Sequence, residues 1–330
     1  MTVAFKKKRR AIGILKGCIL FRSIVDGNAA DFFDGELLDK YSHGGILMKK
    51  FISFIVAALM SVATVFGLVA CGEGNDGDTR PVLKVGMECA YQPYNWTQFD
   101  KSNGAVAIKG KTGQYANGYD VKIAKMIADE LDMKLEIHAY EWESLVPAVQ
   151  SGALDFIIAG MSPTAERKEK IDFSEPYYES NLVIVVRKDG AFANATSLAD
   201  LSGAKITAQS ATFHETVISQ IAGVSAQPSM EDFPTMITAL KSKTIDGYIA
   251  EQPGAIADCN GNSDFKYLPL VNNTEFGFTV ADLSNVTLAV GLKKNSELLT
   301  KINTIIAGIT VDQRQALMNE AITQAAALGL

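Results

Sequence analysis

Hydrophobic positions in the middle of the chain change from a helical spacing to a short continuous run. Between residues 142 and 152 apolar side chains recur every three or four positions, which predicts an amphipathic helix that ends at Gly152. Residues 155–159 read Asp-Phe-Ile-Ile-Ala and predict a buried strand. A turn of small residues follows at 160–164, and a charged helix comes after it. This order of elements is typical of an α/β fold.

The alternation of strand and helix patterns continues from residue 82 to the end of the sequence. Strands are predicted at 82–87, 135–140, 181–186, 204–209, 244–250 and 286–292, and helices at 120–131, 232–243, 298–309 and 312–330. Asp120 is the predicted N-cap of the first of these helices, and residues 97–117 read as a local polar excursion. Residues 232–250 repeat the helix–strand order of residues 142–159, so two lobes of similar construction are expected.

The turn at 160–164 is a candidate anion site. A strand that ends in a turn and a helix start presents backbone N–H groups and a hydroxyl, here near Gly160 and Ser162, where anions bind. Arg167 adds a planar guanidinium that matches a carboxylate. The alternative for Arg167 is a surface ion pair with Glu166 or Glu169.

Charge is distributed unevenly along the chain. Residues 1–70 hold 10 of the 31 Lys and Arg and 5 of the 37 Asp and Glu, which leaves 21 basic against 32 acidic residues after position 70. An acidic body argues against nucleic acid as a partner. The four cysteines, Cys18, Cys71, Cys89 and Cys259, form no Cys/His cluster in the sequence, so no structural zinc site and no cofactor are expected.

A leader is predicted at residues 48–70. Two lysines precede an apolar run at 51–66, and Leu-Val-Ala-Cys follows at 68–71. These four residues resemble a bacterial lipobox, which implies cleavage before Cys71, acylation of that cysteine and anchoring at the outer side of the bacterial cell membrane. A plain signal peptide or an uncleaved membrane helix are the alternatives, although the run is shorter than the ~20 residues of a full span.

The segments on either side of this leader have simpler interpretations. Residues 71–81 are polar and contain glycine, so they predict a flexible tether. Residues 1–47 precede the signal, and we expect either that translation starts at Met48 or that they form an extra basic arm.

Residues 142–178 resemble the solute-binding proteins of amino-acid uptake ABC transporters, the family 3 solute-binding proteins. The resembling motifs are Leu-Val-Pro-Ala-Val-Gln-Ser-Gly at 145–152, Asp155, Gly-Met-Ser at 160–162, Thr-x-x-Arg at 164–167 and Ile-Asp-Phe-Ser-Glu-Pro-Tyr at 171–177. The resemblance implies a two-lobed α/β fold of the type II periplasmic-binding-protein class, with mainly parallel sheets, flanking helices and two crossover strands. Lobe 1 would comprise 82–183 and 288–330, and lobe 2 would comprise 184–287.

The family also implies how a free amino acid is held between the lobes. Gly160, Ser162 and Arg167 would bind its carboxylate from lobe 1, and Thr212 would do so from lobe 2. Ser210 stands where the family usually has glycine, and a simple N-cap is a compatible role for Thr212. Four further residues of the predicted site are Glu251 for the α-ammonium, Glu88 for the ammonium or a cationic side chain, and Tyr91 and Trp142 on the two faces of the ligand's side chain.

The resemblance predicts a monomeric extracytoplasmic binding protein, not an enzyme, that delivers its ligand to an ABC permease. A cationic amino acid is compatible with Glu88, but the sequence leaves the ligand open. The first alternative is an enzyme on the same fold, similar to cyclohexadienyl dehydratases, with Glu88 or Glu251 as general acid. The second is the sensor domain of a signalling receptor, which would need a transmembrane helix and an output domain downstream. Cys89 and Cys259 are expected to be free thiols.

Overall fold

The computed structural model describes residues 78–328. The leader at 48–70, the acylation site Cys71, the segment 1–47 and most of the predicted tether lie outside these residues, and their interpretation stays a prediction. No helix among residues 78–328 is both long and apolar enough to cross a membrane.

The first of two five-stranded sheets forms the core of lobe 1, in the order β6-β1-β7-β16-β8. Its strands are β1 (Val82–Met87), β6 (Lys134–Ala139), β7 (Phe156–Ile157), β8 (Asp172–Phe173) and β16 (Gly291–Leu292). β1 pairs in parallel with β6 and β7. β16 runs antiparallel to β7 and β8, because the chain returns there from lobe 2.

The second sheet forms the core of lobe 2, in the order β12-β11-β13-β10-β14. Its strands are β10 (Leu182–Arg187), β11 (Lys205–Thr207), β12 (Ser225–Ala226), β13 (Gly247–Glu251) and β14 (Phe265–Leu268). β11 is parallel to β12 and β13, whereas β10 is antiparallel to β13 and β14. In each sheet four strands run in one direction and one is reversed, which agrees with the expected mainly parallel sheets. The reversed strands are β16 in lobe 1 and β10 in lobe 2, and each directly follows a crossover segment.

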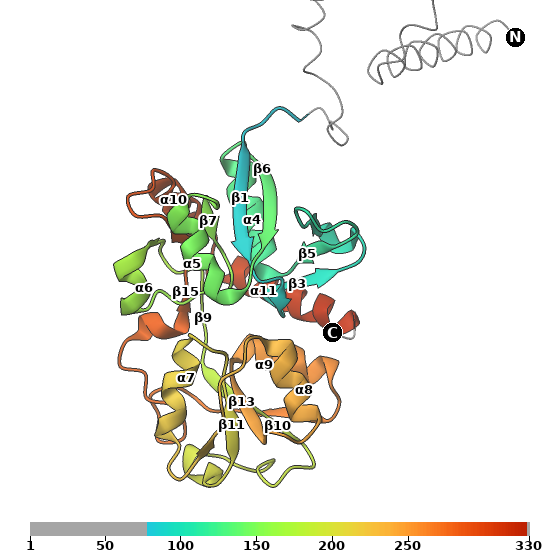
Figure 1. Ribbon diagram of the computed structural model, residues 1–330, viewed down its shortest axis with the longest axis vertical. Coiled ribbons are helices and arrows are strands. Elements are labelled where there is room, and N and C mark those ends of the chain that lie inside the picture. The colour runs from blue at the N-terminus through green and yellow to red at the C-terminus, as the bar shows by residue number, and fades with distance from the viewer. Residues whose placement is uncertain (1–77, 329–330) are drawn as a thin grey trace, which may run out of the picture. The chain divides into compact units, whose positions relative to one another are not determined.

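Two segments connect the lobes and pair with each other as an antiparallel ribbon between them (Figure 1). They are β9 (Tyr178–Glu179) and β15 (Thr287–Leu288). This agrees with the expected two crossover strands. A small antiparallel sheet of β2 (Ala90–Tyr91), β3 (Asn95–Gln98), β5 (Tyr115–Asn117) and β4 (Val106–Ala107) forms the excursion predicted after the first strand.

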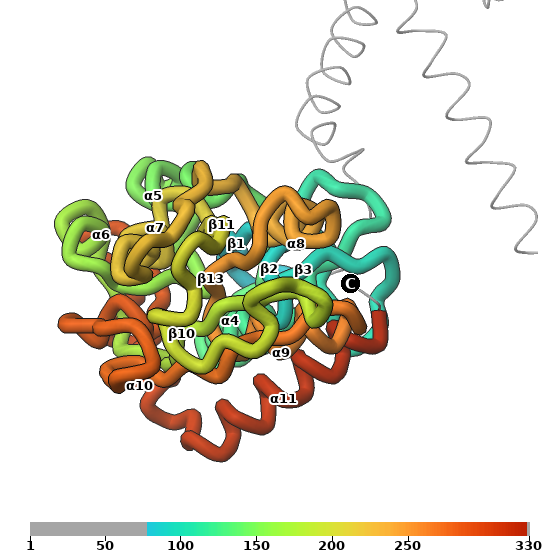
Figure 2. The backbone as a smooth tube through the Cα atoms, turned by 90° about the horizontal axis from the view of Figure 1, so that it is seen from below, coloured from blue at the N-terminus to red at the C-terminus, as the bar shows by residue number. Residues whose placement is uncertain are grey.

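Helices surround the two sheets. Those of lobe 1 are α4 (Tyr119–Glu130), α5 (Trp142–Ser151), α6 (Ala165–Lys170), α10 (Leu298–Gly308) and α11 (Val311–Ala327), and those of lobe 2 are α7 (Phe213–Val217), α8 (Phe233–Lys241) and α9 (Gln252–Gly261). α5 ends at Gly152 with a φ of 80°, as predicted. α11 packs against α4 and also lies along α9 of the other lobe (Figure 2).

The predicted N-cap of α4 is wrong. The helix begins at Tyr119 with Gly118 as its N-cap, and Asp120 lies fully buried in its first turn. Asp120 accepts hydrogen bonds from Asn95 Nδ2 at 2.9 Å and from the Tyr177 hydroxyl at 2.8 Å. Gly118 has a φ of 130°, and a Cβ there would lie 2.2 Å from the Tyr94 carbonyl oxygen, so the chain needs glycine at this entry.

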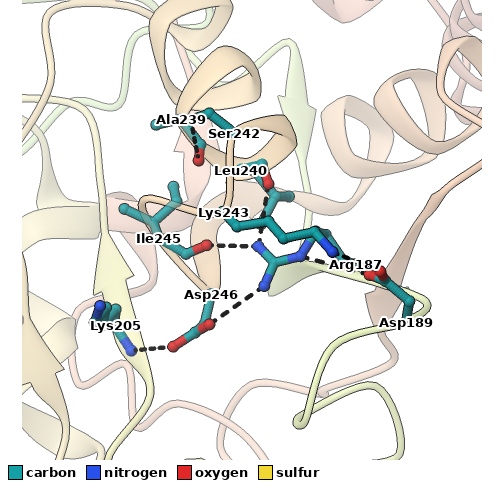
Figure 3. A network of polar contacts seen from close by, with 9 residues as sticks. All are labelled: Arg187, Asp189, Lys205, Ala239, Leu240, Ser242, Lys243, Ile245 and Asp246. Carbon is teal, nitrogen blue, oxygen red and sulfur yellow. Dashed lines mark hydrogen bonds and ion pairs between the residues drawn. The ribbon is translucent and has the colours of Figure 1, made fainter.

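Arg187 fixes the start of β13 from the end of β10 (Figure 3). Its guanidinium donates to the carbonyls of Leu240 at 3.1 Å and Ile245 at 2.6 Å, and it lies 3.4 Å from Asp246. These bonds satisfy carbonyl groups where α8 ends and the chain turns into β13. The strand that Arg187 fixes in this way ends at Glu251.

Candidate functional site

Side chains from both lobes line one narrow pocket. The lining residues are Tyr91, Trp142, Ala159, Gly160, Ser162 and Arg167 from lobe 1, and Gln209, Thr212, Phe213, His214, Phe233 and Glu251 from lobe 2. The enclosed space is about 20 Å³, which is about the room of one water molecule. Seven of the eight predicted site residues therefore meet at one place, and Glu88 does not line it. Their contacts with a ligand stay a prediction.

Arg167 reaches the pocket from the start of α6. The Thr164 hydroxyl caps this helix by accepting from the Arg167 backbone N–H at 3.3 Å. The guanidinium donates to the carbonyls of Ser162 and Ala211, each at 2.9 Å, and so connects the lobes. Burial lowers the pKa of Arg167 to about 10, so the group stays charged at neutral pH. The alternative was a surface ion pair between Arg167 and Glu166 or Glu169, but Glu166 pairs with Lys170 at 2.7 Å instead.

The turn at Gly160 is connected to the buried carboxylate of Asp120 through the Tyr177 hydroxyl. Gly160 has a φ of 61°, and its backbone N–H donates to the Tyr177 hydroxyl at 3.2 Å. Tyr177 in turn donates to Asp120. Burial raises the pKa of Asp120 to about 6, although its hydrogen bonds oppose this shift. Sequence reasoning missed this role because Asp120 lies next to a helix start, where an N-cap is the usual interpretation.

Glu251 ends β13 and is 4 % exposed. One carboxylate oxygen lies 3.0 Å from His214 Nε2, and the other accepts a hydrogen bond from the Tyr91 hydroxyl of lobe 1. Burial alone would raise the pKa of Glu251, but the His214 ring and the two hydrogen bonds lower it below its ordinary value. The pocket thus contains an ionised carboxylate. His214 was not predicted, because its partner is 37 residues away in the sequence.

The two predicted aromatic residues each have another partner. Tyr91 stacks on Phe233 of lobe 2 with ring centroids 4.1 Å apart and planes 15° apart. Trp142 lies under the Arg167 guanidinium at 4.9 Å, and its indole N–H donates to the Ala211 carbonyl at 3.4 Å. Both rings therefore contribute to contacts between the lobes in this closed arrangement. Their placement against a ligand side chain stays a prediction.

Glu88 lies behind the pocket and reaches it through Gln209. Its Oε1 accepts from Gln209 Nε2 at 2.9 Å, while its Oε2 is buried with no hydrogen-bond partner among residues 78–328. Burial is the main reason that the pKa of Glu88 rises to about 8, and the Gln209 bond opposes the rise. Glu88 is therefore mostly protonated at neutral pH in this closed state. Gln209 was missed because its polar side chain lies in a predicted strand without a motif.

Thr212 is the N-cap residue of α7, but its hydroxyl donates to the Gln209 carbonyl at 2.7 Å and does not cap the helix. The left-handed backbone of this turn is at Ala211, with a φ of 55°, rather than at Ser210 where the family has glycine. This conformation directs the Ala211 carbonyl to Arg167 and Trp142. The turn therefore connects the lobes through its backbone.

Metal ligands and thiols were the remaining candidates for chemistry in residues 78–328. This part of the chain has no group of three or more His, Cys, Asp and Glu side chains placed to hold a metal ion. Cys89 and Cys259 have free thiols, as predicted. Burial raises the pKa of each thiol to about 12, so neither is a reactive thiolate at neutral pH.

Comparison with known proteins gives the same fold. The sequence profile of the bacterial extracellular solute-binding proteins, family 3, matches residues 83–322. The arginine-binding extracellular protein ArtP of Bacillus subtilis (strain 168) is 28 % identical over 263 residues, which cover 78 % of this chain and 91 % of ArtP.

Solved structures agree. An amino acid ABC transporter substrate-binding protein from Streptococcus pneumoniae, bound to L-arginine, superposes with a TM-score of 0.61 at 26 % identity, covering 73 % of this chain and 94 % of that one. An ancestral arginine-binding protein bound to arginine gives a TM-score of 0.58 at 30 % identity, covering 73 % and 98 %. The chain belongs to the bacterial extracellular solute-binding proteins, family 3.

Proposed function

We propose that the protein is a lipid-anchored extracytoplasmic binding protein that captures a free amino acid between its lobes and delivers it to an ABC importer. One observation carries the ligand class: Arg167 of lobe 1 and the ionised Glu251 of lobe 2 line the same pocket. A free amino acid has one carboxylate and one ammonium group, so its two charges match this pair.

The contacts of the two charged groups support a specific arrangement of the bound ligand. A ligand carboxylate would take the guanidinium bonds that Ser162 and Ala211 accept in the closed structure, and the Gly160 turn and Thr212 would lie beside it. Each oxygen of Glu251 keeps a lone pair beside its bond to His214 or Tyr91, so an ammonium can join without displacing either. Because the enclosed space is so small, the lobes must separate before a ligand enters.

A cationic side chain is the ligand class that fits Glu88. Oε2 of Glu88, which has no hydrogen-bond partner among residues 78–328, and the side-chain oxygen of Gln209 offer acceptors, and Gln209 lines the pocket together with Tyr91 and Trp142. A cation there would favour the ionised form of Glu88 and offset its burial. ArtP is an arginine-binding protein, and both solved structures described above hold arginine, which supports this class.

The predicted leader at 48–70 supports attachment to the membrane, and membership of the family supports delivery of the ligand to an ABC permease. Acylation of Cys71 would hold the monomeric protein at the outer face of the membrane, and the polar residues 71–81 would let it reach a permease. Growth with a labelled fatty acid should label the unmodified chain and leave Cys71→Ala unlabelled. An unmodified chain without label would contradict the lipid anchor.

Ligand capture is tested by thermal unfolding of the full chain, first unfolded and refolded to remove any ligand, with each of the twenty amino acids. We expect a raised Tm with arginine, lysine or ornithine, because a ligand that binds only the folded state stabilises it. Arg167→Ala should abolish the shift, and Lys170→Ala on the same helix should keep it. No shift with any amino acid would contradict the proposal, and conversion of a bound ligand to product would favour an enzyme.

A further inference from the structure

We propose that Asp120 positions both ends of the ligand pocket in lobe 1, through Tyr177 at the carboxylate end and through Asn95 at the side-chain end. This inference rests on the proposed function and adds a positioning residue to it. Asp120 does not line the pocket, so it acts on a ligand only through the residues that it holds.

The Asp120 carboxylate has a buried partner on each of its oxygens. Oδ1 accepts from the Tyr177 hydroxyl at 2.8 Å, and Oδ2 accepts from Asn95 Nδ2 at 2.9 Å. Burial raises the pKa of Asp120 to about 6, so most of the group is ionised at neutral pH and accepts at both oxygens. All three residues are fully buried, so water cannot replace a bond that is lost.

The first connection leads from Asp120 to the turn at Gly160. The Tyr177 hydroxyl accepts from the Gly160 backbone N–H at 3.2 Å while it donates to Asp120. Burial raises the pKa of Tyr177 well above its ordinary value, so the hydroxyl keeps the proton that it donates. Gly160 and Ser162 line the pocket beside Arg167. Loss of the Tyr177 hydroxyl should therefore disturb the end of the pocket that would bind the ligand carboxylate.

The second connection leads from Asp120 to the loop between β1 and β2. The Asn95 side chain donates to Asp120 and accepts from the Cys89 backbone N–H at 2.8 Å. Cys89 has a φ of 59°, a left-handed conformation that is strained for an L-residue and depends on such bonds. This strained residue lies between Glu88 and Tyr91 in the chain. Loss of the Asn95 amide should therefore disturb the end proposed for the ligand's side chain.

A purely structural role for this network predicts a different result. If its bonds only stabilised lobe 1, their loss would lower the affinity for every ligand by the same factor. A positioning role instead reduces the contribution of one end of the ligand, because the groups that bind that end are displaced. Ligands that lack one end can therefore distinguish the two roles.

The test uses L-arginine with two analogues, agmatine, which lacks the α-carboxylate, and L-norvaline, which lacks the guanidinium group. The ratio of each analogue's Kd to that of arginine measures the contribution of the missing group. Calorimetry, with displacement titrations for weak ligands, compares the full chain with Tyr177→Phe, Asn95→Leu and Asp120→Ala. Tyr248→Phe is the matched control, because Tyr248 is also fully buried and donates to the buried Asp258 at 2.6 Å, but does not line the pocket.

We expect Tyr177→Phe to lower the agmatine ratio at least about fivefold, the equivalent of one hydrogen bond, and to change the norvaline ratio less than about twofold. Asn95→Leu should do the reverse, Asp120→Ala should lower both ratios, and Tyr248→Phe should lower neither.

Ratios that stay unchanged, or that fall alike in Tyr177→Phe and Asn95→Leu, would overturn the inference and leave the proposed function standing. These two variants decide the question if Asp120→Ala does not fold. Absence of arginine binding by the unmodified chain would overturn the inference together with the cationic ligand class of the proposed function.

Discussion

Tyr91 and Phe233 stack nearly face to face although they belong to different lobes and stand 142 positions apart in the sequence. Both rings are almost fully buried. Phe233 is the first residue of α8, and the Asp232 side chain caps that helix by accepting from Thr235 N at 2.8 Å. The stack therefore joins a helix start of lobe 2 to the small sheet of lobe 1.

Replacing Phe233 with leucine should weaken closure. Leucine keeps an apolar side chain but loses the ring contact, and aromatic pairs contribute about 0.5–1.5 kcal/mol beyond their burial. We expect ligand affinity to fall about twofold to tenfold, mainly through faster dissociation, as measured by calorimetry and stopped-flow fluorescence. Unchanged affinity would show that the stack does not stabilise the closed state.

Closure of the protein without ligand should depend on Glu88 and on pH. The pKa of Glu88 is raised from 4.5 to about 8 in the closed state, so this state is favoured by protonation. The contribution of Glu88 to the stability of the closed state is therefore fully present below about pH 4.5, and it is lost as the pH rises through about 8. Separation of the lobes would remove Gln209 from Glu88 and expose the carboxyl group to water, so we expect the radius of gyration by X-ray scattering to increase between pH 6 and pH 9.

Glu88→Gln is the control for this pH dependence. Its amide oxygen can still accept from Gln209, but it has no charge to desolvate. Its radius of gyration should therefore stay constant over the same range. A pH-dependent opening that persists in this variant would assign the effect to another group.

Alanine substitutions at two glycines with positive φ, Gly160 and Gly152, should distinguish backbone strain from damage to the pocket. An alanine Cβ at Gly160 would lie 3.1 Å from the Tyr91 ring, whereas one at Gly152 would have no atom within 4 Å. Both substitutions should lower stability by about 1–2 kcal/mol, because an L-residue is strained at these φ values. Only Gly160→Ala should also reduce ligand affinity, about tenfold or more by calorimetry. Equal affinities of the two variants would place the Tyr91 contact outside the binding mechanism.

Arg187 should matter for stability rather than for binding. Arg187→Met would leave two buried carbonyls without their donor, and each such loss costs about 1–3 kcal/mol. We expect the free energy of unfolding in urea to fall by about 3 kcal/mol, with ligand affinity per folded molecule nearly unchanged. Lys243→Met is the control, since the Lys243 side chain makes an exposed pair with Asp189. Equal losses in both variants would contradict a special role for Arg187.

Local patterns in the sequence were enough to predict most of the fold. The end of α5 at Gly152, the turn at Gly160 and the start of α6 at Thr164 depend on neighbouring residues, and the structure has them where predicted. The N-cap at Asp120 was wrong because Asn95 and Tyr177, which are distant in sequence, take up its carboxylate. The role of Asp120 could not be predicted from its neighbours in the sequence, because its carboxylate could either cap the helix or accept from these distant side chains.

The residues of the pocket, like the elements of the fold, could be predicted from the sequence only in part. The residues carried over from the family resemblance meet in space, except for Glu88, which lies one residue behind the lining. His214 and Gln209 could not be predicted, because their roles depend on Glu251 and Glu88, which other parts of the chain bring to them. Their sequence context contains no motif, and only the folded chain shows the pairing.

The contact between α11 and α9 restricts how the lobes can separate. Lobe motion that preserves both this contact and the β9–β15 ribbon must rotate about an axis that passes near the two of them. Figure 2 places α9 and α11 along one edge of the molecule and α5 and α7 along the opposite edge. Displacement is then greatest between α5 and α7, so a pair of spin labels on these two helices would measure each opening as a change in distance.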